Sequence, residues 1–82
     1  MMESFEVKGS LFSNGMWHFC MSAADFLPIE HGTKYTDGLK VFAFRGFDML
    51  AGVKEPQMVS LCFDGPPGES RSMEGIRLNR ID

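Results

Sequence analysis

Several features that would identify a class of protein are scarce in this sequence. It has only two cysteines, Cys20 and Cys62, so it is not a disulfide-rich secreted framework. No apolar run approaches the ~18 residues that a membrane span requires, and the first residues lack the basic and apolar regions of a signal peptide. We therefore expect a cytoplasmic protein without a membrane partner.

The sequence also lacks a large excess of positive or negative charge. The net charge is −3, the isoelectric point is near 5.2, and no run of like charge exceeds two residues. Proteins that bind mainly through phosphate backbones carry a basic surface. The composition therefore weighs against nucleic acid as the main ligand, although a local basic stripe remains compatible with it.

Motifs that carry catalysis are missing too. The sequence has no G-x-S-x-G nucleophile elbow, and its glycine-rich stretch 64–72 has no lysine and contains two prolines that remove amide donors. A chain of 82 residues has little room for the shell that positions catalytic groups. We expect a protein that is not an enzyme and has no cofactor and no metal. A zinc site is the alternative, but its candidate ligands lack the close pairs of structural zinc sites; they are His18, Cys20, His31 and Cys62.

What the sequence does contain is a series of strand signals. Asn14-Gly15 between two apolar segments predicts a type I′ hairpin turn, because both central residues of that turn need positive φ. Gly9, inside the first apolar segment, predicts a bend or bulge. Trp17, Phe19 and Met21 alternate along the second segment and form its expected core face. The expected strands cover residues 4–13, 16–22, 39–47, 57–63 and 73–81.

Two short helical turns are expected between these strands, at 23–27 and 48–54, and residues 64–72 should form an exposed, mobile loop. The predicted fold class is all-β, or β-rich α+β, with one domain spanning residues 1–82. We expect a small five-stranded antiparallel barrel. The order of elements resembles the OB fold, and an SH3-like barrel or an antiparallel sheet with one packed helix would use the same strands.

Large flexible apolar side chains are abundant, with eight phenylalanines and seven methionines. The strand expected at 39–47 is apolar on both faces. The sequence predicts that its core face consists of Leu39, Val41, Ala43 and Phe47. Lys40, Phe42 and Phe44 would then stand on the opposite face, together with Met16 and His18 of the 16–22 strand.

The excess of phenylalanine and methionine on an acidic chain predicts a non-catalytic binding module. Its function would be protein–protein interaction, of an accessory or inhibitor type. The partner would be another protein or a second copy of the chain. The alternative is an OB-like protein that binds single-stranded nucleic acid, with bases stacked on aromatic rings and cations along the phosphates. The candidate binding residues are Met16, Trp17, His18, Lys40, Phe42, Phe44, Arg45 and Arg71.

Overall fold

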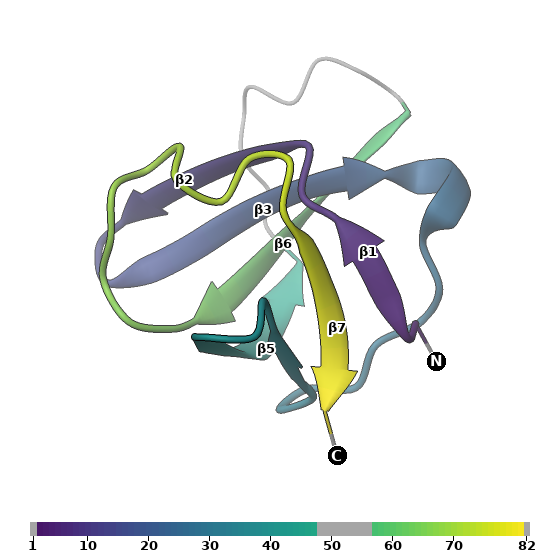
Figure 1. The fold of residues 1–82 in the computed structure, drawn as a ribbon. Helices are drawn as coiled ribbons and strands as arrows, with labels where there is room; N and C mark the ends of the chain where they lie inside the picture. The colour runs from purple at the N-terminus through teal and green to yellow at the C-terminus, as the bar shows by residue number, and fades with distance from the viewer. Residues whose placement is uncertain (1, 48–56, 82) are drawn as a thin grey trace.

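The computed structural model describes residues 2–47 and 57–81, and all of its strands belong to one antiparallel sheet (Figure 1). The all-β class is confirmed. The helix expected at 48–54 lies outside the described residues. The strands follow the order β1-β7-β4-β5-β6-β3-β2 across the sheet. Their bounds, with those of the one short helix among the described residues, are β1 Ser4–Glu6, β2 Gly9–Ser13, β3 Met16–Ser22, η1 Ala23–Asp25, β4 Lys34–Thr36, β5 Val41–Phe47, β6 Met58–Asp64 and β7 Arg77–Ile81.

The structure has seven strands where the sequence predicts five. One reason is β4, which forms within a segment expected to be a polar connection. The other is that the first expected strand divides at Val7 and Lys8, so that β1 pairs with β7 while β2 pairs with β3. The backbone N–H of Val7 donates to Ile76 O at 2.9 Å, and that of Lys8 donates to Cys20 O at 2.7 Å. The expected bend is therefore present, one to two residues before the expected position at Gly9.

This bend gives the sheet its curvature. β1 and β2 stand at the two ends of the strand order, yet only two residues separate them along the chain. Because two residues span less than about 11 Å from Cα to Cα, the two ends of the sheet must come near each other. No hydrogen-bonded ladder joins β1 to β2 in the described parts of the chain, so the sheet curls without closing.

The hairpin between β2 and β3 has the predicted turn. Asn14 and Gly15 have φ values of 55° and 78°, and Ser13 pairs with Met16 across the turn. A single helical turn, η1, follows β3 as expected from the sequence. Ser22 occupies its N-cap position in an extended conformation but makes no side-chain capping hydrogen bond.

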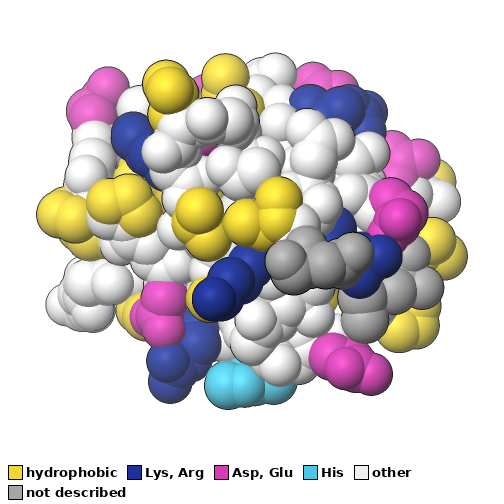
Figure 2. All heavy atoms as spheres, turned by 60° about the horizontal axis from the view of Figure 1, so that its bottom comes forward, with side chains coloured by type: hydrophobic (Ala, Val, Ile, Leu, Met, Phe, Trp, Pro, Cys, Tyr) yellow, Lys and Arg dark blue, Asp and Glu magenta, His cyan; other side chains and the backbone are white. Residues whose placement is uncertain are grey.

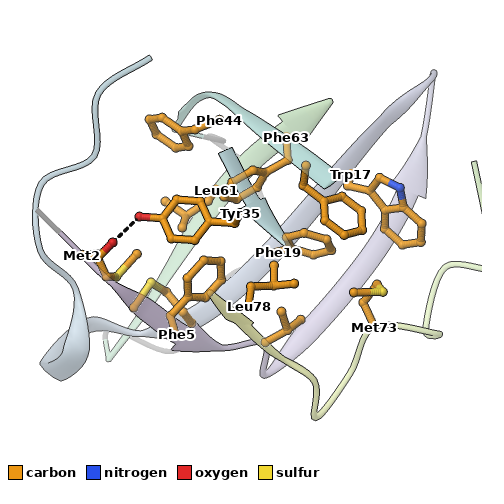
Figure 3. Close-up of a cluster of buried hydrophobic side chains, with 13 residues drawn as sticks. Met2, Phe5, Trp17, Phe19, Tyr35, Phe44, Leu61, Phe63, Met73 and Leu78 are labelled. Atoms are coloured by element: carbon orange, nitrogen blue, oxygen red, sulfur yellow. Dashed lines mark hydrogen bonds between the residues drawn. The ribbon is translucent and has the colours of Figure 1, made fainter. Parts of the chain in front are cut away.

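The inner face of the sheet is filled mainly by aromatic rings (Figure 3). Phe63 lies at the centre of this cluster, with its ring centroid 5.3 Å from that of Phe19 and 5.5 Å from that of Phe44. The hydroxyl of Tyr35 donates to Met2 O at 2.5 Å, so the one buried phenol has a partner. The buried hydrophobic residues are Met2, Phe5, Val7, Trp17, Phe19, Met21, Tyr35, Phe42, Phe44, Leu61, Phe63, Met73 and Leu78.

The segment between β6 and β7 covers one end of this core. Nε1 of Trp17 donates to Pro66 O at 2.8 Å, and Gly65 packs against the ring of Phe42. A Cβ at Gly65 would lie 2.9 Å from Cε1 of Phe42 and 3.2 Å from Cδ1 of Trp17. Residues 65–72 thus form a loop, as predicted, although Asp64 still belongs to β6, and the hydrogen bond from Trp17 holds this loop against the core.

Candidate protein-binding surface

Three of the expected binding residues lie in the core. Trp17 and Phe42 are fully buried, and Phe44 is 3% exposed. Phe42 contacts both Trp17 and Phe19 edge to face, with ring centroids 6.0 and 5.3 Å apart. The prediction that Phe42 and Phe44 stand on the outer face is therefore wrong, and the structure has no aromatic platform at these residues.

A β-bulge explains the error. The register between β5 and β6 shifts between Phe44 and Gly46, which makes Arg45 an extra residue in β5. Phe44 pairs with the buried Phe63 before the bulge, and Phe47 pairs with the buried Leu61 after it. Strict alternation would place Phe44 and Phe47 on opposite faces of the sheet. Burial of the rings of Phe42 and Phe44 also removes more apolar area from water than burial of the smaller side chains between them would.

The other expected binding residues are distributed over separate parts of the surface. Met16 and His18 are half-buried on the outer face of β3. Arg45 is exposed at the bulge, where its Nη1 lies 2.5 Å from Oδ2 of Asp64. Arg71 is exposed in the segment before β7, and Lys40 is half-buried in the turn between β4 and β5. The structure therefore does not bring the predicted cations together.

A different surface is formed by the outer faces of β4, β5 and β7. Lys34 of β4 pairs with Ala43 of β5 on one side and with Ile81 of β7 on the other. In the neighbouring row Thr36 pairs with Val41. Val41 is 46% exposed and Ile81 is 37% exposed. Two exposed apolar side chains therefore lie beside a lysine on the outer face of the sheet.

The turn between β4 and β5 presents a third apolar residue, Leu39, which is 91% exposed. Oδ1 of Asp37 accepts hydrogen bonds from the backbone N–H groups of Leu39 and Lys40, at 2.9 and 2.7 Å. The hydroxyl of Thr36 donates to Lys40 O at 2.6 Å and accepts from the N–H of Gly38 at 3.0 Å. Four hydrogen bonds therefore fix a turn whose leucine makes little contact with the protein. We call Lys34, Leu39, Val41, Ala43 and Ile81 the Leu39 surface.

The electrostatics of the turn agree with its hydrogen bonds. Partial burial acts to raise the pKa of Asp37, but the backbone hydrogen bonds from Lys40 and Leu39, together with the Lys40 charge, outweigh it and leave the pKa below the ordinary 3.8. Asp37 is therefore ionised at neutral pH and holds the turn as a charged acceptor.

Lys34 differs from the arginines near it in its charge pairing. Arg80 contacts Glu3 at 2.7 Å, and Arg77 donates to Ser4. Within residues 2–47 and 57–81, Lys34 makes no ion pair. Figure 2 shows one face of the molecule, on which several hydrophobic side chains lie in a row with basic and acidic side chains near them. The Leu39 surface thus combines exposed apolar groups with an uncompensated positive charge.

Sequence reasoning missed most of this surface, although one signal for it was present. Asp37-Gly38 is a turn dipeptide of the kind that joins two strands, and Gly38 has a φ of 102°. Recognition of that turn would have predicted β4 and the projection of Leu39. Lys40 is the only one of the expected binding residues that lies in this turn.

Two other expectations concern metals and membranes. Among the residues that the structure describes, no three of the His, Cys, Asp and Glu side chains gather to hold a metal ion. In the same residues no helix has the length and apolar character that crossing a membrane demands. Comparison of the chain with protein-family models, with curated proteins and with solved structures found no match.

Proposed function

We propose that this protein is a non-catalytic binding module that recognises another polypeptide through the Leu39 surface. The observation that carries the proposal is the leucine in the β4–β5 turn, which is almost fully exposed although four hydrogen bonds fix its backbone. A fixed turn loses little conformational entropy on binding, and burial of a leucine side chain contributes about 1.5–3 kcal/mol.

The surface also favours a partner of defined chemistry. Lys34 stands between Ala43 and Ile81 without a counter-charge among the described residues. A partner that presents apolar side chains around a carboxylate would satisfy both features. In a symmetric pair of identical chains the same surface would face itself and bring two lysines together, so a different polypeptide fits better than a second copy.

The alternative, binding of single-stranded nucleic acid, has less support. Stacking of bases requires exposed aromatic rings, and the rings of Trp17, Phe42 and Phe44 are buried. The arginine at the bulge is engaged with a carboxylate, and the net charge is negative. The aromatic residues predicted for the alternative therefore provide no stacking platform, and the structure does not bring the cations predicted for it together.

We further propose that the curled sheet serves as a barrel-like support for binding. The bend at Val7 and Lys8 brings the ends of the sheet together, as in the small OB-like and SH3-like barrels that the order of elements resembles. The aromatic core packs against the inner face of β4, β5 and β7 and so supports their outer face from behind.

The test is a selection of displayed peptides on the immobilised protein, followed by affinity measurements on the enriched sequences. We expect peptides that combine apolar residues with Asp or Glu, and we expect Leu39→Asp to weaken their binding at least about ten-fold, which is about 1.4 kcal/mol. The matched control is Leu27→Asp, because Leu27 is a second exposed leucine, 51% accessible and outside the Leu39 surface. Equal binding to both variants, or enrichment of no peptide, would contradict the proposal.

A further inference from the structure

A separate group of reactive side chains lies on the outer face of β3 and β6. His18 pairs directly with Cys62, and Cys20 pairs directly with Ser60. The four side chains share one face, because His18 and Cys20 are two residues apart on one strand and Ser60 and Cys62 are two apart on the other. Side chains that are directly opposed in this way have Cβ atoms about 4.5–5.5 Å apart. Imidazole and thiol of the first pair are therefore within reach of each other.

The strands on either side present glycines to the two thiols. Gly9 pairs with Cys20, and a Cβ at Gly9 would lie 3.7 Å from Cβ and 4.0 Å from Sγ of Cys20. Gly46, at the bulge of β5, pairs with Cys62, and a Cβ at Gly46 would have no atom of the described residues within 4 Å. Glycine within a strand often marks a place where another molecule approaches. Among the described residues, no side chain occupies the position next to Cys62 on β5.

Ser60 provides an independent indication of a bound group. It is 6% exposed, and its hydroxyl has no hydrogen-bond partner among the described residues. Buried hydroxyls without partners are uncommon, and each calls for an explanation. The hydroxyl lies on the same face as Cys62, two residues away on β6, where it can donate to a group attached to that thiol.

We propose that Cys62 is a modification site that forms a mixed disulfide with a small disulfide of the glutathione type. The Cys62 thiolate attacks one sulfur of the disulfide, the new S–S bond forms, and the original S–S bond breaks. The departing thiolate takes up a proton from His18 or from water. One equivalent of the small disulfide is consumed and one thiol is released, so the exchange needs no other oxidant.

The register explains why the mixed disulfide would persist. Cys20 and Cys62 are diagonal neighbours on adjacent strands, and neither is in a disulfide. Diagonal pairs in a sheet have Cα atoms about 7–8 Å apart, whereas a disulfide usually needs about 4.4–6.8 Å. Cys20 is therefore poorly placed to displace the attached group and form an internal bond.

The pairing of the strands places one described ionisable side chain directly opposite the thiol. His18 faces it from β3, and the nearest ionisable groups on β5 and β6 are Arg45 and Asp64, which pair with each other at 2.5 Å. The neighbouring positions of β2 and β5 are Leu11 and Gly46, which carry no charge. His18 is thus the group best placed to stabilise a thiolate at Cys62.

The experiment treats the reduced, folded protein with oxidised glutathione at pH 7 and follows adducts by intact-mass and peptide mass spectrometry. We expect one glutathione on Cys62, attached about ten-fold faster than to the same chain unfolded in urea. Cys62→Ser should abolish the adduct and Cys20→Ser should retain it. His18→Gln should lower the rate toward that of the unfolded chain, with circular dichroism confirming that the variant is folded.

Several outcomes would overturn the proposal. These are an adduct on Cys20 with Cys62 unmodified, an internal disulfide that leaves no attached glutathione, and a rate equal to that of the unfolded chain. A His18→Gln variant that is folded and reacts as fast as the original protein would remove the role assigned to the imidazole.

Discussion

Replacement of Gly65 by alanine should destabilise the protein, because Gly65 packs against the aromatic core. Gly65→Ala adds one methyl group at a position where the backbone φ is not in the left-handed region. That methyl carbon would lie 2.9 Å from Cε1 of Phe42 and 3.2 Å from Cδ1 of Trp17. Both rings are fully buried, and Trp17 is also held by its hydrogen bond to Pro66 O. Neither ring can therefore move aside without disturbing the core.

The expected magnitude has two parts. Forcing one methyl group into a packed core costs about 1–3 kcal/mol. Replacement of glycine by alanine also reduces the entropy of the unfolded chain, which stabilises by about 0.4–1 kcal/mol where the native conformation accepts the new residue. The net loss for Gly65→Ala is therefore at most about 2.6 kcal/mol, with a central value of roughly 1 kcal/mol. In a domain of this size each kcal/mol changes Tm by about 4–8 °C.

Gly9→Ala is the matched control. Its new methyl group would lie 3.7 Å from Cβ of Cys20, which is ordinary van der Waals contact. We expect its stability to equal that of the original protein or to exceed it by up to about 1 kcal/mol. Urea and thermal unfolding of both variants provide the comparison. Equal stability of the two variants would refute the packing that the structure assigns to the 64–72 loop.

Three further predictions concern the core and the turn. Trp17→Phe removes the N–H that binds Pro66 O, which should lower the free energy of unfolding by about 1–3 kcal/mol in urea titrations. The pKa of Asp37 is lowered by folding, so its contribution to stability is present above about pH 4 and is lost as the pH falls further. The Tm difference between the protein and Asp37→Ala should therefore shrink between pH 4 and pH 2, approximate limits set by the ordinary pKa of this side chain. Burial raises the pKa of Tyr35, so stability should fall as the pH rises above about 10, and Tyr35→Phe should weaken that dependence in thermal scans.

The local features of the fold could be predicted from the sequence. Asn14-Gly15 fixes the first hairpin because few other residues accept two successive positive φ values. The alternation of Trp17, Phe19 and Met21 identifies the buried face of β3, since a one-residue shift would expose all three. Signals of this kind act within a few residues and do not depend on the rest of the chain.

The irregularities that place the candidate site could not be predicted in the same way. The bulge at Arg45 and Gly46 changes which residues of β5 face inward, and its position depends on the pairing with β6. The division of the first strand at Val7 and Lys8 likewise depends on hydrogen bonds to partners far along the chain. Neither partner can be identified from local alternation.

The candidate site was missed for a related reason. A large aromatic residue on an apolar strand serves equally well in a core or on a binding surface, and only the three-dimensional packing decides between them. Phe42 and Phe44 proved to be core residues, whereas the exposed apolar residues include Leu39, Val41 and Ile81.

The most direct test of the proposed function is photo-crosslinking in the source cell. A photoreactive amino acid replaces Leu39 in one version of the protein and Leu27 in the other, and the adducts are identified by mass spectrometry. We predict a discrete adduct with a different polypeptide at position 39 that is absent at position 27 and is lost when Lys34→Glu is added. An adduct only with a second copy of the chain, an adduct with nucleic acid, or the same adducts at both positions would contradict the account.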